Sequence, residues 1–263
     1  MKANFHTHTY RCRHAVGDER EYIEAAVQAG FEQLGFSDHT PWPRDGEKRY
    51  GVGMDIEELA GYVESLRALR AEYAPKLDLK IGLECEYFRR YAPWLKDAIA
   101  ELQLDYVILG NHFEGTDTQG MYFGNITDAA SALTYLRMTV EGMETGMYAY
   151  LAHPELFLRS MPEWNRDMAN VCRELCRAAN AMHMPVEYNL EGVRSQRRHS
   201  QTGIAYPNRD FWDIAAEEGC TAIIGYDAHM PESLLDAADF EAARRLLEVE
   251  LGMKRIDSIF AGE

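Results

Sequence analysis

KANFHTH, residues 2–8, sets the pattern that decides the fold, because a short apolar run ends there in His6 and His8. Side chains alternate between the two faces of an extended segment, so both imidazoles point to the same side. TAIIGYDAH, residues 221–229, repeats the pattern and ends in Asp227 and His229. Both ends of the chain therefore deliver side chains of the metal-ligand type from an extended segment.

Apolar runs of this kind alternate with amphipathic stretches along the whole chain of 263 residues. The alternation predicts parallel βα units, and the length suits one α/β barrel better than two small domains. Helices are expected at about 18–29, 55–72, 92–102, 127–144, 164–182, 208–218 and 232–250, and a long polar loop at 190–206. The seven expected strands are 2–6, 33–37, 77–83, 106–110, 147–152, 185–189 and 221–225.

Six of these seven strands end in a histidine or a carboxylate, and the sixth along the chain ends in Asn189. Chemistry in parallel barrels lies at the carboxyl ends of the strands, so these side chains should meet at one rim. A lone histidine is more often a core or surface residue, but nine donors at one rim favour metal binding, and three ions sharing bridges would use them all. The nine are His6, His8, His14, His39, Glu84, His112, His153, Asp227 and His229.

A cluster of metal ions suits one kind of reaction in particular. Such a cluster produces hydroxide near neutral pH, neutralises anionic oxygens of a substrate and stabilises the leaving oxygen. Phosphate-ester hydrolysis needs all three effects, because its transition state carries charge on several oxygens. The residues therefore favour a metal-dependent phosphoesterase.

The order of these motifs resembles that of the PHP (polymerase and histidinol phosphatase) family over nearly the whole chain. The motifs are His6-Thr7-His8, His14, Ser37-Asp38-His39, Glu84, His112, Ala152-His153-Pro154 and Asp227-Ala228-His229. The resemblance implies a distorted (β/α)7 barrel formed by residues 1–263 as a single domain, with a trinuclear site of zinc, manganese or iron. By this resemblance the first ion is held by His6, His8, Glu84 and Asp227, the second by Glu84, His112 and His153, and the third by His14, His39 and His229.

Within the family, the chain resembles the histidinol-phosphatase branch. His14-Ala15 before an acidic helix, the run from Ser37 to Pro41, and the chain length carry this resemblance, while Gly110-Asn111-His112-Phe113 departs from it. It implies hydrolysis of L-histidinol phosphate in histidine biosynthesis, by in-line attack of a metal-bridging hydroxide, with Glu84, Asp227 and His229 as catalytic residues. The alternatives are a phosphoesterase for another small phosphate ester, nucleotide or phosphoprotein, and a metal-binding regulatory module without catalysis.

Arginine is the side chain whose fork matches the oxygens of a phosphate group. Arg159, Arg194 and Arg197 are therefore candidates for substrate binding, as is Arg198, and Asn189 is a further candidate contact. The basic run of residues 194–199 has the alternative interpretation of a solvated loop. Asp38 could orient the imidazole of a ligand, and Glu86 could lie at the mouth of the site. The aromatic residues Trp42, Tyr50, Tyr122 and Phe123 could contact the substrate or pack the loops.

The composition excludes some classes of partner. A net charge of −16 repels phosphate backbones and argues against a nucleic-acid binder, although bound metal ions still allow a small phosphorylated substrate. No apolar run is long enough for a membrane span, and we expect no cleaved leader, because cleavage near the start would remove the first histidine motif. Five scattered cysteines fit a reducing cytoplasm. Both a monomer and a homodimer remain open.

Overall fold

The computed structural model describes residues 1–43, 52–116, 120–198 and 203–260. Two parallel sheets lie in its centre. The first has the order β1 (Ala3–Asn4), β2 (Gln33–Phe36), β3 (Asp78–Cys85) and β4 (Tyr106–Leu109). The second has the order β5 (Val186–Asn189), β6 (Ala222–Gly225) and β7 (Arg255–Ile256).

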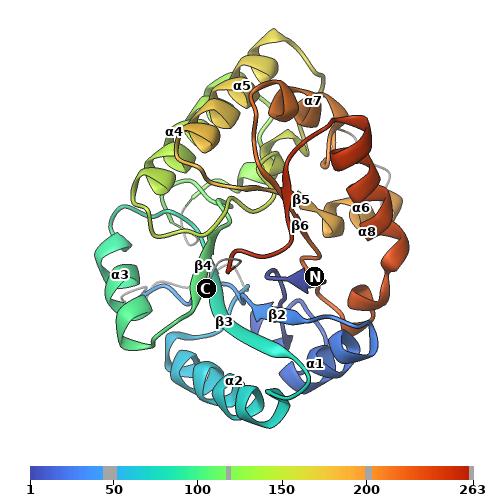
Figure 1. Cartoon of the computed structure of the whole chain (residues 1–263). Coiled ribbons are helices and arrows are strands. Elements are labelled where there is room, and N and C mark those ends of the chain that lie inside the picture. Colours follow the sequence, from blue (N-terminus) through green and yellow to red (C-terminus); the bar gives the residue numbers. More distant parts are fainter. Residues whose placement is uncertain (44–51, 117–119, 199–202, 261–263) are drawn as a thin grey trace.

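Single bridging residues join these two sheets into a barrel. Leu151 pairs in parallel with Leu109 on one side and with Val186 on the other, and Thr7 pairs in parallel with Ala228. The strands therefore close into a ring, and the helices lie around it (Figure 1). The predicted distorted barrel of parallel βα units is confirmed.

The fifth expected strand, at 147–152, is reduced to the single residue Leu151. Its amide donates to Pro185 at 3.0 Å and its carbonyl accepts from Glu187 at 2.9 Å, so it makes the hydrogen bonds of a strand on one side. The chain then turns at His153, which has a φ of 30°. The expectation of a full strand was wrong because residues 147–150 contact β4 through only two hydrogen bonds, from the amide of Ala149 to Val107 at 2.8 Å and from the amide of Leu109 to the carbonyl of Tyr150 at 3.0 Å. β7 was not expected, since Arg255 and Ile256 follow no apolar run.

The helices cover the outside of the barrel close to their expected positions. Asp18 caps α1 through a capping box with Glu21, and the amide of Asp55 donates to Glu58 Oε2 at 2.7 Å in a second such box. The helices are α1 (Glu19–Gln28), α2 (Leu59–Tyr73), α3 (Ala92–Glu101), α4 (Ala129–Glu144), α5 (Arg166–Ala181), α6 (Leu190–Arg198), α7 (Arg209–Glu217) and α8 (Ala237–Arg244). Shorter 3₁₀ turns are η1 (Tyr10–Cys12), η2 (Ile56–Glu58), η3 (Phe123–Asn125), η4 (Leu156–Leu158) and η5 (Pro231–Leu235), and η6 (Arg245–Glu250) is a π-helical stretch after α8.

Helix α6 corrects the expectation of a long loop after β5. Asn189 Oδ1 accepts a hydrogen bond from the amide of Gly192 at 2.8 Å, which satisfies a donor in the first turn. Glu191 then pairs with Arg194 three positions later, a spacing that supports a helix. The polar composition suggested a loop, but these local pairs and the burial of Leu190 favour a helix.

Aromatic side chains fill the inside of the barrel at one end. Phe5, Tyr106, Ile108, Tyr150 and Ile223 form a core cluster with Ala3 and Ala152, and Phe260 packs against it. The ring of Phe260 lies 5.5 Å from that of Phe5 and 6.0 Å from that of Tyr106.

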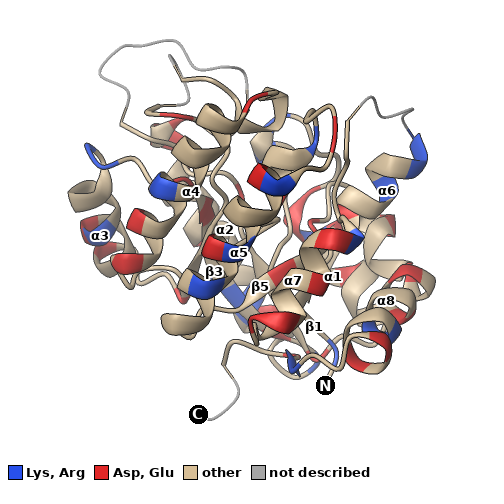
Figure 2. Cartoon of the chain, turned by 90° about the horizontal axis from the view of Figure 1, so that it is seen from above, with Lys and Arg blue, Asp and Glu red and all other residues tan. Residues whose placement is uncertain are grey.

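The two ends of the described chain lie together. The ammonium group of Met1 lies 3.9 Å from Asp257, and the N-terminus is at the bottom of the view in Figure 2. The carboxyl ends of the parallel strands, where the predicted ligands lie, open at the other end of the barrel. None of the helices in the described ranges has the length and apolar character needed to cross a bilayer.

Candidate metal centre and active site

The nine predicted ligands gather at the carboxyl ends of the strands. A cavity of about 570 Å³ opens there, a volume typical of a small-molecule site. His6 and His8 are fully buried below it, because they follow β1 into the centre of the barrel. The other seven line the cavity itself: His14, His39, Glu84, His112, His153, Asp227 and His229.

Glu84, at the end of β3, lies in the middle of the cluster. Its Oε2 is 3.4 Å from His6 Nε2, 3.3 Å from His8 Nε2 and 3.0 Å from His39 Nδ1. Its Oε1 is 2.8 Å from His153 Nε2 and 3.4 Å from His112 Nε2. One carboxylate therefore faces five imidazoles, two with one oxygen and three with the other, which is the placement needed to bridge two ions.

Asp227 joins the group around Glu84 Oε2. Its Oδ1 lies 3.3 Å from His6 Nε2 and 3.3 Å from His8 Nε2. Asp227 has a φ of 45° and His153 a φ of 30°, conformations that are strained for residues other than glycine. Two of the ligands are thus held in costly backbone positions that turn their side chains into the centre.

His14, His39 and His229 form a separate group at the exposed edge. Their ligand atoms lie within 4.8 Å of one another, and His14 Nε2 is 2.9 Å from His229 Nε2. The other ring nitrogens of His14 and His229 are 2.9 and 3.0 Å from the carbonyl oxygens of Cys12 and Asp227. Both Nδ1 atoms are therefore donors, and both Nε2 atoms present lone pairs to the same point.

The electrostatics of the cluster separate two kinds of histidine. Burial alone would lower the pKa of His6, but the charges of Asp227, Glu187 and Glu84 outweigh it and raise the pKa well above its usual range. Burial lowers the pKa of His39 to about 4, although Glu84 opposes the shift. Burial and the neighbouring His8 likewise lower the pKa of His229. The neighbouring carboxylates thus favour the protonated form of the deep His6, whereas His39 and His229 remain neutral.

Several buried polar atoms in the cluster lack a hydrogen-bond partner among the described residues: His6 Nε2, His8 Nε2, Glu84 Oε2 and Asp227 Oδ1. Buried polar atoms are rarely left without a partner, and these four face one another. Imidazole nitrogens and carboxylate oxygens are donors that zinc, manganese and iron accept. The residues therefore fit divalent metal ions.

Glu187, on β5, is a part of the site that the sequence analysis missed. Its Oε1 lies 2.8 Å from His6 Nδ1, and its Oε2 accepts hydrogen bonds from the amide of His153 at 3.0 Å and from Asn189 Nδ2 at 2.9 Å. A ligand histidine commonly donates its second N–H to a carboxylate, which fixes the ring. The available signal was an acidic residue inside the apolar run of residues 185–189, two positions before Asn189 and so on the same face.

Glu86 and Asp38 support the site in different ways. Glu86 Oε1 lies 3.1 Å from His112 Nδ1, and its Oε2 accepts a hydrogen bond from Trp42 Nε1 at 2.8 Å. Asp38 accepts hydrogen bonds from the amide and the hydroxyl of Thr9, both at 2.9 Å. Glu86 thus orients a ligand, whereas Asp38 holds the segment after β1.

Of the aromatic candidates, Tyr122 lines the cavity and its ring stacks on that of His112 at 6.5 Å. Trp42 and Phe123 are buried, and Trp42 stacks on Tyr91 at 5.7 Å, as the loop-packing interpretation expects. Tyr50 and His199 lie outside the described residues.

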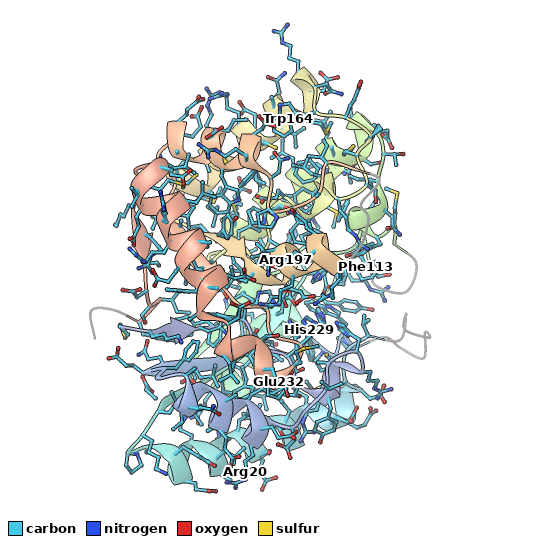
Figure 3. The ribbon with its side chains drawn as sticks, turned by 90° about the vertical axis from the view of Figure 1, so that its right-hand side faces the viewer. Arg20, Phe113, Trp164, Arg197, His229 and Glu232 are labelled. Atoms are coloured by element: carbon cyan, nitrogen blue, oxygen red, sulfur yellow. The ribbon has the colours of Figure 1, made fainter. Side chains whose placement is uncertain are left out.

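The four candidate arginines have different surroundings. Arg159 and Arg198 line the cavity. Arg194 pairs with Glu191 at 2.9 Å and donates to the carbonyl of Tyr226, and it is absent from the cavity lining. Arg197 pairs with Asp239 and is absent from the cavity lining, whereas Phe113 and His229, which are labelled with it in Figure 3, line the cavity.

Asn189 also lies below the cavity rather than in its wall. It is buried, and its Nδ2 donates to Glu187 at 2.9 Å and to Asp227 Oδ2 at 3.1 Å. This amide therefore orients the carboxylates of the cluster.

The sequence model of the PHP domain family matches residues 4–191 of this chain. This range contains all the predicted ligands except Asp227 and His229. The chain belongs to the PHP family. As a PHP protein it is 27% identical over 241 residues to a protein of Deinococcus radiodurans named as a probable histidinol-phosphatase, over 86% of this chain and 85% of that protein. It is 24% identical over 260 residues to the histidinol-phosphatase of Bacillus subtilis, over 87% and 94% of the two chains.

The fold of this PHP protein is also that of a solved relative. Histidinol phosphate phosphatase (HisK) of Lactococcus lactis, whose crystal structure holds zinc, L-histidinol and phosphate, superposes with a TM-score of 0.72 at 19% identity. The superposition covers 97% of this chain and 95% of that one. At this identity the likeness establishes the fold, while the chemistry rests on the site.

Proposed function

We propose that this PHP protein is a metal-dependent phosphomonoesterase that hydrolyses L-histidinol phosphate to L-histidinol and phosphate. The observation that carries the proposal is the carboxylate of Glu84, which faces five imidazoles at the floor of a cavity. The choice of substrate is supported by the names of the relatives, which cover most of both chains. The fold alone would not decide between substrates.

The nine ligands divide among three divalent ions in this proposal. His6, His8, Glu84 and Asp227 would hold the first ion, Glu84, His112 and His153 would hold the second, and His14, His39 and His229 would hold the third. When bound, such ions activate water and neutralise phosphoryl oxygens. Zinc is supported by the composition of the Lactococcus lactis complex, while the donor set also suits manganese and iron.

The residues of the chain position the substrate at this centre. We propose that Arg159 binds the phosphoryl oxygens, because this exposed residue lines the cavity and the fork of its guanidinium matches two of them. Arg198 lies at the same cavity but already pairs with Glu191. Glu84, Asp227 and His229 are the proposed catalytic residues, since they belong to the cluster and also line the cavity.

The remaining wall of the cavity suits the organic part of the substrate. Phe113, Tyr122, Tyr206 and Leu156 contribute aromatic and apolar surface beside the metal ligands. A planar imidazole ring can pack against such rings. The floor of the cavity thus carries the metal ligands that suit a phosphate group, and its aromatic wall suits the organic alcohol that hydrolysis releases.

A reducing compartment and a small-molecule partner complete the proposal. All five cysteines are free thiols, which supports the cytoplasm. In the view of Figure 2, Lys and Arg are mixed with Asp and Glu over the outer helices. The net charge of −16 supports the proposal that nucleic acid is not a partner. We further propose that residues 1–263 act as one domain.

Phosphate release from L-histidinol phosphate tests the function. Zinc-loaded and manganese-loaded protein are compared with chelator-treated protein, beside a panel of other phosphomonoesters and with Glu84→Gln as a matched control. Strong preference for L-histidinol phosphate supports the proposal. Activity on other esters alone would support a phosphoesterase but contradict L-histidinol phosphate as its substrate. No activity on any ester by the metal-bound protein would favour a non-catalytic module.

A further inference from the structure

The histidines of the cluster share a pattern on the side away from the metal centre. His6 Nδ1 lies 2.8 Å from Glu187 and His112 Nδ1 lies 3.1 Å from Glu86. His14 and His229 use backbone carbonyl oxygens for the same purpose. A histidine that binds metal through one nitrogen needs an acceptor for the N–H of the other, and this acceptor fixes the ring and raises its basicity.

Two histidines depart from the pattern, because His153 Nδ1 and His8 Nδ1 are both buried without a hydrogen-bond partner among the described residues. At His8, Nε2 lies 3.3 Å from both Glu84 Oε2 and Asp227 Oδ1, so this nitrogen faces the centre. The Nδ1 of His8 thus points away from the centre, and the side chain is fully buried. A buried donor without a partner in a native structure requires an explanation.

Cys12 lies beside the imidazole ring of His8. Its Sγ is within 4.8 Å of a ring nitrogen of His8, and the residue is fully buried at the end of η1. The carbonyl of Cys12 is already taken, because it accepts hydrogen bonds from His14 Nδ1 and from the amide of Gly53, both at 2.9 Å. The sulfur of Cys12, a weak hydrogen-bond acceptor, is therefore the acceptor of this residue that can bond to His8.

We propose that Cys12 is a positioning residue of the metal centre, whose sulfur accepts the Nδ1–H of His8. The thiol would do for His8 what the carboxylate of Glu187 does for His6. The inference rests on the metal centre proposed above. Its consequence is that loss of the thiol weakens metal binding through His8, although Cys12 itself does not touch the ion.

Three variants test this role. Cys12→Ala removes the acceptor, Cys12→Ser retains a hydroxyl acceptor, and Cys172→Ala removes an equally buried thiol from α5, no residue of which lines the cavity. Zinc affinity is measured by competition with a chelator, and the thermal unfolding of each metal-free variant is recorded beside it. We expect Cys12→Ala to lower zinc affinity about 10- to 100-fold, Cys12→Ser to restore part of it, and Cys172→Ala to leave it unchanged.

Cobalt-substituted protein separates positioning from direct ligation. We expect no sulfur-to-cobalt charge-transfer band in the unmodified chain. A band that disappears in Cys12→Ser would make Cys12 a ligand and overturn the inference, as would unchanged zinc affinity in Cys12→Ala. If the unmodified chain binds no metal, the proposed metal centre fails instead, so the two failures are distinguishable.

Discussion

The carboxylate of Glu187 lies 2.8 Å from Nδ1 of His6, although 181 positions separate the two residues. Glu187 reaches His6 past Gly225 of the neighbouring strand β6, and a Cβ at Gly225 would lie only 1.7 Å from Glu187 Oε1. A glycine at the end of β6 is therefore needed for the deepest ligand to be oriented. Gly110 has the same relation to Glu84, since a Cβ there would lie 2.0 Å from Glu84 Oε1.

Glu187→Gln should weaken the metal centre without unfolding the protein. The amide keeps the size of the carboxylate but loses the charge that orients His6 and favours its donation to an ion. We expect a loss of about 10- to 100-fold in metal affinity and in kcat/KM. Metal competition and steady-state kinetics measure it, with the exposed Glu217→Gln as a control. Equal affinity in both variants would show that Glu187 has no such role.

Gly225→Ala should also lower metal affinity, through a steric clash with the Glu187 side chain rather than through loss of its charge. The added methyl group displaces the Glu187 side chain, and overpacking of this kind costs about 1–3 kcal/mol of stability. Thermal unfolding and metal affinity are measured together. If the clash is with Glu187, the double variant Gly225→Ala with Glu187→Ala is less destabilised than the sum of the two single variants. Gly61→Ala, where a Cβ meets nothing within 4 Å, is the control.

Glu84→Gln should change the number of ions bound as well as the rate. Both oxygens of the carboxylate face ring nitrogens, and a neutral amide would replace one of those oxygens with a nitrogen that cannot bind a cation. We expect fewer zinc ions per chain by elemental analysis and a fall in kcat/KM of more than about 100-fold, beyond the effect of removing a supporting carboxylate. Full zinc content in the variant would contradict the bridging role.

Arg159→Met and Arg197→Met should differ sharply. A charge-assisted hydrogen bond is worth about 1.5–3 kcal/mol, so loss of Arg159 should lower kcat/KM by roughly 10- to 100-fold. Arg197 pairs with Asp239 outside the cavity lining, and its loss should leave kcat/KM nearly unchanged. Kinetics with one phosphate ester compare the two. A larger effect at Arg197 would reassign the phosphate contact to α6.

Zinc affinity should rise with pH around neutrality. In the metal-free protein, burial lowers the pKa values of His6 and His8, but the neighbouring carboxylates raise them by more. Both pKa values therefore lie well above the usual range. These imidazoles must lose protons to bind zinc, so affinity gains up to about tenfold per pH unit for each proton released. The gain ends above the raised pKa values.

The carboxylates should add nothing to this dependence at neutral pH. Burial raises the pKa values of Glu84 and Asp227, but the nearby histidines lower them by more. Both pKa values are therefore well below the usual range, and both groups are already ionised. Calorimetry in buffers of different ionisation enthalpy counts the protons released on zinc binding. An affinity independent of pH between 6 and 8, without proton release, would be inconsistent with protonated His6 and His8 in the metal-free state.

The strands and ligands that could be predicted are those with a local signal. Residues 33–37 and 221–225 are apolar runs bounded by polar residues, and the ligand follows each run directly. The position of His39 or Asp227 at the rim therefore follows from the strand before it. Leu151 and β7 could not be predicted in this way, because single or paired residues join a sheet only through the partners that the fold supplies.

The supporting contacts had no local signal. Glu187 and His6 are far apart in sequence, and the sulfur of Cys12 meets His8 only after η1 turns the chain. The roles of the arginines were open for the same reason. Arg197 and Arg198 are neighbours in the chain, yet α6 directs one to Asp239 and the other to the cavity.

The sequence by itself determined the parallel barrel and the nine donors at its rim, because apolar runs and the side chains that end them are local features of the chain. Only the tertiary structure decided which nitrogen of each histidine faces the centre, which carboxylates hold the rings and which arginines line the cavity. Those choices depend on distances between strands that meet only when the barrel closes, and hydrogen bonds and charges act over just a few ångströms.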